Sequence, residues 1–142
     1  MNNLEQRLQT LEDRQTLQDT LTAYLVAIDA MSSIDDILKC LTEDAEYDMS
    51  AINYPCFKGS AAVREFFSSV FNNMSHQAHY ATNFHIDHIT ANTASCRSHV
   101  IGKAITKDAD EICIYLQYLL EFKRGDDGWK ICSIYSKPLL PL

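Results

Sequence analysis

The fold of this chain is decided by residues 111–131, which read EICIYLQYLLEFKRGDDGWKI. Apolar side chains alternate with a more mixed set over residues 111–124, and this period of two is typical of a β-strand. The next four residues, GDDG, predict a tight turn into a further strand at residues 129–137. We therefore expect an antiparallel hairpin at this end of the chain.

The two faces of the strand at residues 111–124 differ in character. One face carries six apolar side chains, Ile112, Ile114, Leu116, Tyr118, Leu120 and Phe122. The other face is semi-apolar, with Cys113, Tyr115, Gln117 and Leu119. A sheet of this kind buries its apolar face under helices and offers the other face to a partner. We expect a homodimer through this second face, to which we also assign Ile134.

Helices precede this sheet in the sequence. Leucines at residues 4–11 and apolar side chains at residues 17–28 form two helical stripes whose register shifts around Arg14. They predict one long helix or two in series over residues 4–30. The very polar segment at residues 1–15 is expected to be a helical arm that faces a partner.

Three shorter elements are expected between this helix and the main sheet. Ser33 predicts the cap of a short helix that reaches Leu41, and residues 45–49 predict a strand. After a loop at residues 53–59, Ser60 predicts the cap of a third helix, whose apolar positions run from Val63 to Met74 at helical spacing.

Strands are also expected at residues 79–88 and 93–106, ahead of the hairpin. Helices followed by an antiparallel meander give an α+β fold. The length of 142 residues suits one domain over residues 1–142.

Composition limits the function classes. The formal net charge is −7, and the basic residues do not cluster, which argues against a nucleic-acid partner. No apolar stretch is long enough to span a bilayer, and no signal peptide is visible. Five cysteines without a Cys-x-x-Cys pair indicate reduced thiols in a cytoplasmic protein.

An acid occupies a position where a core residue is expected. Asp29 shares a helix face with Leu21 and Leu25, and it would need a partner there. Residues 79–83, HYATN, open a predicted strand and supply His79. A carboxylate that orients an imidazole is the minimum of an acid–base dyad. The alternative is that Asp29 caps the end of its helix.

The order of elements resembles that of the SnoaL-like domains, which belong to the cone-shaped nuclear-transport-factor-like superfamily. Five segments carry the resemblance: residues 27–29 (AID), 41–45 (LTEDA), 57–59 (FKG), 79–83 (HYATN) and 128–131 (GWKI). The resemblance implies helices packed in a strongly curved sheet that encloses an internal pocket. It also implies a cofactor-independent enzyme for a small apolar, aromatic or polyketide-like molecule.

Within that superfamily, the placement of Asp29 and His79 resembles scytalone dehydratase and lindane dehydrochlorinase, two kinds of eliminating enzyme. The resemblance implies that His79 removes a proton from carbon while Asp29 orients it and balances its charge. The dehydrochlorinase lysine is replaced here by Tyr24, and its arginine falls at Ser133 or Ile134. These departures leave the dyad without the groups that define either named reaction.

Other candidate site residues are assigned alongside alternatives. Tyr24 and Tyr47 either polarise a substrate oxygen or lie in the core. Phe67 and Phe71 are core residues that can also form a pocket wall. Asn83 faces the cavity or makes a turn hydrogen bond. The second dehydratase histidine falls near Ser98, with His99 adjacent.

A metal site is not expected. The two His-x-x-His spacings at residues 76–79 and 85–88 place their members on opposite faces of a strand. Two function classes therefore remain at this stage, an enzyme of proton transfer and a non-catalytic binding or assembly module of the same fold. The sequence names no substrate.

Overall fold

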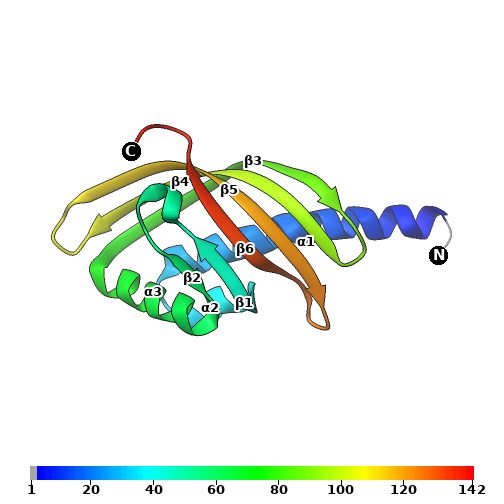
Figure 1. Ribbon diagram of the computed structural model, residues 1–142, viewed down its shortest axis with the longest axis horizontal. Coiled ribbons are helices and arrows are strands. Elements are labelled where there is room, and N and C mark those ends of the chain that lie inside the picture. Colours follow the sequence, from blue (N-terminus) through cyan, green and yellow to red (C-terminus); the bar gives the residue numbers. More distant parts are fainter. Residues whose placement is uncertain (1–2) are drawn as a thin grey trace.

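The computed structural model describes residues 3–142, whose six strands form one curved sheet with the helices on one of its faces (Figure 1). In chain order the elements are α1 (Asn3–Ala30), α2 (Ile34–Leu38), β1 (Leu41–Asp48), the 3-10 helix η1 (Ser50–Ile52), β2 (Cys56–Lys58), α3 (Ser60–Asn73), β3 (Met74–Ile89), β4 (Thr93–Thr106), β5 (Glu111–Gly125) and β6 (Gly128–Pro138).

The sheet is mixed. Its strand order is β2-β1-β6-β5-β4-β3, with β1 parallel to β6 and every other neighbouring pair antiparallel. The hairpin predicted from GDDG joins β5 to β6, where Gly125 pairs with Gly128. This arrangement confirms the predicted α+β fold.

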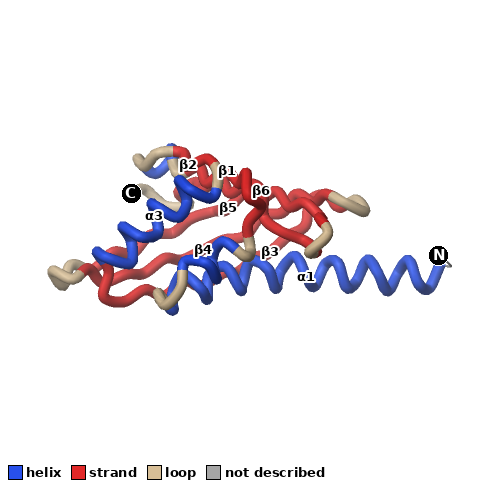
Figure 2. Tube along the Cα trace, turned by 90° about the horizontal axis from the view of Figure 1, so that it is seen from below, coloured by secondary structure: helices blue, strands red, loops and turns tan. Residues whose placement is uncertain are grey.

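The first helix is continuous, and its two apolar stripes have different surroundings. Leu17, Leu21, Tyr24 and other side chains of its second half are buried against the sheet. Leu4, Leu8 and Leu11 are 72%, 55% and 64% exposed, because this end of α1 projects beyond the sheet (Figure 2). The partner-facing role of residues 1–15 stays a prediction, and residues 1–2 of that arm lie outside the described range. Within residues 3–142 no helix is long and apolar enough to cross a membrane.

A polar clamp fixes α1 to the β5–β6 hairpin. Asp13 accepts a hydrogen bond from the Trp129 indole at 3.2 Å and another from Arg124 of β5. The Arg124 guanidinium carbon lies 4.7 Å from the centre of the Trp129 ring, in cation–π geometry. Since the Asp13 side chain is only 12% exposed, this ion pair is shielded from water. The clamp fixes the position of α1 along the sheet.

Several element boundaries differ from the prediction. Strand β1 begins at Leu41, which pairs with Ile131 of β6. Helix α2 therefore ends at Leu38 and does not reach Leu41 as predicted. Residues 56–58 form an edge strand in place of a loop. Strand β3 starts at Met74, directly after α3.

The predicted helix caps also need correction. Gly59, not Ser60, is the cap of α3, and its φ of 86° favours glycine. Ser33 occupies the cap of α2 without a side-chain cap bond.

Ile134 was assigned to the wrong face of the sheet. Phe122 pairs with Ile131 whereas Glu121 pairs with Ser133, so Cys132 is an extra residue in β6. Such a bulge shifts the alternation of side chains by one. Ile134 is therefore buried in the core, on the same side as Ile131.

Candidate active site

The last turn of α1 and the middle of β3 meet through two hydrogen bonds. Oδ1 of Asp29 lies 2.6 Å from Nδ1 of His79, and Oδ2 accepts the His79 backbone N–H at 2.9 Å. The side chains are 27% and 17% exposed, respectively. A carboxylate only accepts hydrogen bonds, so Nδ1 carries a proton, and in the neutral imidazole the second ring nitrogen, Nε2, has a free lone pair.

The contact also explains the acid at this position of the helix. A negative charge in the last turn of a helix opposes the helix dipole, and α1 has no basic residue in its last turn. A carboxylate cannot bond the free carbonyl groups there either. Asp29 is thus not a helix cap, and both of its oxygens are used by His79.

His79 borders a partly open cavity of about 160 Å³ between α3 and the sheet, whose lining includes the exposed Tyr54 and Lys103. Tyr47, Phe66 and Phe67 form one wall, and Gly102 and Ile114 form part of the opposite wall. The exposed wall surface is mainly apolar. Roughly 150 Å³ of apolar cavity holds one benzene ring. The cavity therefore has room for at least one ring, and a second hollow of about 450 Å³ shares Lys103, Ala104 and Ile112 with it.

The tyrosines predicted for the site have different surroundings. Tyr47 lines the cavity, and its ring stacks on Phe67 with centres 6.0 Å apart. Tyr24 is fully buried behind this wall, with its hydroxyl beside that of Tyr47. Burial raises the pKa of Tyr24 well above its usual value, and the neighbouring Tyr47 adds to this. Tyr47 is thus better placed than Tyr24 to contact a ligand.

A third tyrosine lies in this cluster and was not predicted as a site residue. Burial raises the pKa of Tyr118 well above its usual value, with further contributions from Tyr47 and from the Asp29 carboxylate. Tyr118 comes from the apolar face of β5. The alternation of side chains along β5 predicts that Tyr118 is buried. Its place beside Tyr47 depends on packing across the sheet, which the sequence pattern does not contain.

The remaining predicted side chains do not all reach the cavity. Phe67 lines it, whereas Phe71 packs against the core without lining it. Ser98 is buried and donates its hydroxyl to the Thr82 carbonyl at 3.0 Å. Asn83 is exposed at a bulge of β3 with φ of 55°, and it accepts the Thr82 hydroxyl. In place of Ser98, Gly102 of β4 pairs with His79.

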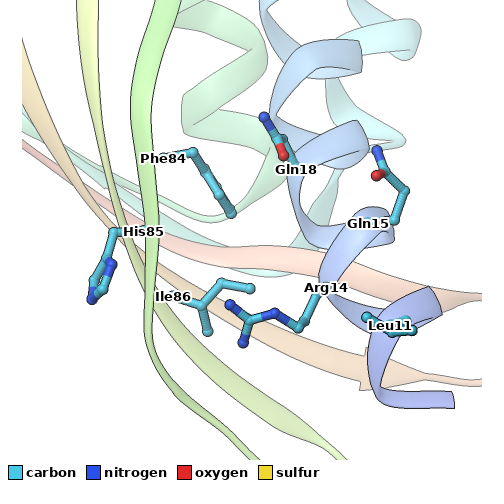
Figure 3. Close-up of a pocket in the computed structure, with 7 residues that line it drawn as sticks. All are labelled: Leu11, Arg14, Gln15, Gln18, Phe84, His85 and Ile86. Carbon is cyan, nitrogen blue, oxygen red and sulfur yellow. The ribbon is translucent and has the colours of Figure 1, made fainter. Parts of the chain in front are cut away.

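A larger groove lies between α1 and β3, about 280 Å³ in volume (Figure 3). Arg14, Gln15 and Gln18 line it from the helix, and Phe84 and Ile86 line it from the strand. Neither member of the Asp29–His79 pair borders it. Among residues 3–142 no group of three or more potential metal ligands converges, in this groove or elsewhere.

Comparison with known proteins finds one matching domain family and several solved structures of the same fold. A model of the SnoaL-like domain matches residues 9–135. A protein from Novosphingobium aromaticivorans, provisionally described as an aromatic ring hydroxylase, is 42% identical over 92% of each chain, with a TM-score of 0.90. No curated protein matches the chain.

Two further structures share the fold at lower identity. A second N. aromaticivorans protein, provisionally described as a scytalone dehydratase, is 19% identical over 92% of this chain and 87% of its own, with a TM-score of 0.83. The hexachlorocyclohexane dehydrochlorinase LinA type 3 from Novosphingobium barchaimii is 20% identical over 94% and 91%, with a TM-score of 0.81.

Proposed function

The chain belongs to the SnoaL-like domain family, and we propose that it is a cofactor-independent enzyme that moves a proton between His79 and a carbon atom of a small apolar substrate. One observation carries this proposal. His79 is held by Asp29 through Nδ1 at 2.6 Å, and the same residue borders an apolar cavity. We assign the catalytic roles to Asp29 and His79 and substrate contact to Tyr47 and Phe67.

The mechanism begins with general base catalysis. Nε2 of His79 takes a proton from a carbon next to a carbonyl group or a leaving group. The electron pair of the broken C–H bond forms a C=C bond, either as an enolate or with departure of the leaving group. The resulting imidazolium is stabilised by the Asp29 carboxylate, and the Tyr47 hydroxyl donates to the substrate oxygen. The proton then passes from Nε2 to the leaving group or back to carbon.

Elimination or hydration is the reaction class that we rank first. A protein provisionally described as a dehydratase and a dehydrochlorinase are among the proteins of the same fold, and both names describe an elimination. Isomerisation and aldol-type cyclisation begin with the same proton transfer and stay as further members of the proposal. The cavity accommodates at least one ring, which is compatible with an aromatic or polyketide-like molecule.

Exchange of carbon-bound hydrogen tests the proposal without knowledge of the natural substrate. Cyclohexanone is a compact ring with acidic α-protons, and their replacement by deuterium in D₂O can be followed by proton NMR. We expect the wild-type protein to accelerate exchange and the His79→Gln variant to lose the acceleration. His76→Gln is the matched control, because His76 is an exposed histidine of the same strand. Equal exchange by wild type and His79→Gln would refute the proposal.

A non-catalytic binding or assembly module is the alternative for this fold. It predicts that Asp29 and His79 lie apart, or that side chains fill the cavity. The 2.6 Å contact beside an open cavity favours the enzyme.

We also propose that two copies associate through the outer face of the sheet. Tyr80, Ile101 and Tyr115 pair in one row across β3, β4 and β5 on that face, and both tyrosines are exposed. Light scattering after size exclusion should give a dimer that Tyr115→Lys weakens. A monomeric wild type would contradict this assembly. The odd set of five cysteines supports a cytoplasmic location as part of the proposal.

A further inference from the structure

A glycine lies in the interior of the sheet where the backbone does not require one. Gly102 is in the middle of β4, paired with His79 of β3 on one side and with Ile114 of β5 on the other. Positive φ angles among the glycines occur at Gly59 and Gly128, not at Gly102. Glycine weakens the interior of a strand, and at such a position it often marks the close approach of a ligand.

The missing side chain leaves space beside the free nitrogen of His79. A Cβ atom at residue 102 would lie 3.4 Å from both Cδ2 and Nε2 of His79, and 3.4 Å from Cγ1 of Ile114. All three residues border the same cavity. The space over Gly102 therefore adjoins the Cδ2–Nε2 edge of the imidazole, whereas Nδ1 is held by Asp29.

A side chain at residue 102 would narrow the cavity beside His79. Its first carbon would touch the edge of the imidazole, at 3.4 Å from both Cδ2 and Nε2. A substrate that reaches Nε2 along this wall would then be displaced by that carbon.

We propose that Gly102 is the specificity-determining residue of the cavity, where it provides the space in which the reacting carbon of a compact ring lies against Nε2 of His79. The inference rests on the proposed function and names the place and size of its substrate. The ring lies between the imidazole edge and Ile114, with the Gly102 backbone beneath it. A cavity of about 160 Å³ leaves room for one such ring.

Binding of benzene to the full chain tests the proposal independently of catalysis. The ring current of a bound benzene should shift the His79 ring-proton signals, which are assigned by their loss in His79→Gln. Gly102→Ala should weaken this binding roughly 10- to 100-fold, the range for one methyl group in a filled pocket. Gly102→Val should abolish it.

Folding controls separate the loss of space from damage to the protein. Contacts of 3.4 Å are tolerated, and alanine restricts the unfolded chain more than glycine does. The melting temperature of Gly102→Ala should therefore stay or rise while its binding weakens. Gly125→Ala is the matched control, because a Cβ atom at residue 125 meets nothing within 4 Å. It should bind benzene as the wild type does.

Either of two results overturns the proposal: wild-type protein whose His79 signals do not respond to benzene, or Gly102→Val protein whose signals respond as strongly as those of the wild type. Failure of the proposed function has a different signature. In that case His79→Gln retains cyclohexanone exchange, whatever benzene does. If cyclohexanone exchange requires His79 but the Gly102 variants bind benzene as the wild type does, only the proposed role of Gly102 is wrong.

Discussion

Replacement of Asp29 by asparagine keeps the shape of the side chain and removes its charge. In the wild type, the two carboxylate oxygens accept from the ring N–H and the backbone N–H of His79, at 2.6 and 2.9 Å. An amide offers one oxygen and one NH₂ group, so one of the two donors then faces another donor. If the ring loses its acceptor, the proton is free to move to Nε2 and the base is lost.

The expected loss follows from the hydrogen bond to the charged ring. A hydrogen bond to a charged group contributes about 1.5–3 kcal/mol, which corresponds to a factor of about 10–150 in rate. Both side chains are largely shielded from water, and without its acceptor the ring proton can move from Nδ1 to Nε2. We therefore place the expected loss of rate near the upper end of this range. We therefore expect Asp29→Asn to lower the exchange rate of cyclohexanone by about 100-fold.

The assay compares two aspartates that face histidines of the same strand. Asp87 lies 3.5 Å from Nε2 of His85 on β3, and neither residue borders the internal cavity. Asp87→Asn should leave the exchange rate unchanged. A rate for Asp29→Asn within about threefold of the wild type, with circular dichroism unchanged, would refute the assigned role of Asp29.

Three other predictions follow from the same contacts. Asp13→Ala should lower the free energy of unfolding in urea by about 2–4 kcal/mol, because it leaves the Arg124 charge and the Trp129 N–H without their acceptor; a loss below about 0.5 kcal/mol would contradict the clamp. Tyr47→Phe should slow cyclohexanone exchange about tenfold, whereas Tyr24→Phe should leave it nearly unchanged, since Tyr24 does not border the cavity. Burial raises the pKa of Tyr24 and Tyr118 in the folded chain, whereas tyrosines of the unfolded chain ionise near pH 10. The folded state then binds more protons above about pH 10, so the melting temperature should fall as the pH rises from 10 to 11; a constant melting temperature would contradict this.

The contact between Asp29 and His79 could be predicted from the sequence because each residue occupies a distinctive place in the pattern. Asp29 breaks an apolar helix face, and His79 falls where the period changes from helix to strand. The fold follows from the same patterns, since strand alternation and the GDDG turn depend on local chemistry. Helix ends were less predictable, because β1 begins where pairing with β6 begins.

The wall of the cavity depends on register, which local patterns do not contain. The bulges near Asn83 and Cys132 each reverse the alternation of side chains. Ile134 therefore lies on the core face in place of the predicted outer face, and of the two alternatives for Asn83 the local hydrogen bond is the one observed. The pairing of His79 with Gly102 in place of Ser98 has the same origin. One signal for it was present in the sequence, an isolated glycine within a strand pattern.

A crystal structure of the wild-type protein with cyclohexanone is the most direct test of His79 as the base. We expect the ring inside the cavity, over Gly102, with an α-carbon about 3–3.5 Å from Nε2 of His79. Its carbonyl oxygen should accept a hydrogen bond from the Tyr47 hydroxyl at about 2.7 Å. A ring bound in the groove between α1 and β3, or one whose α-carbons point away from His79, would contradict the role of His79 as the base.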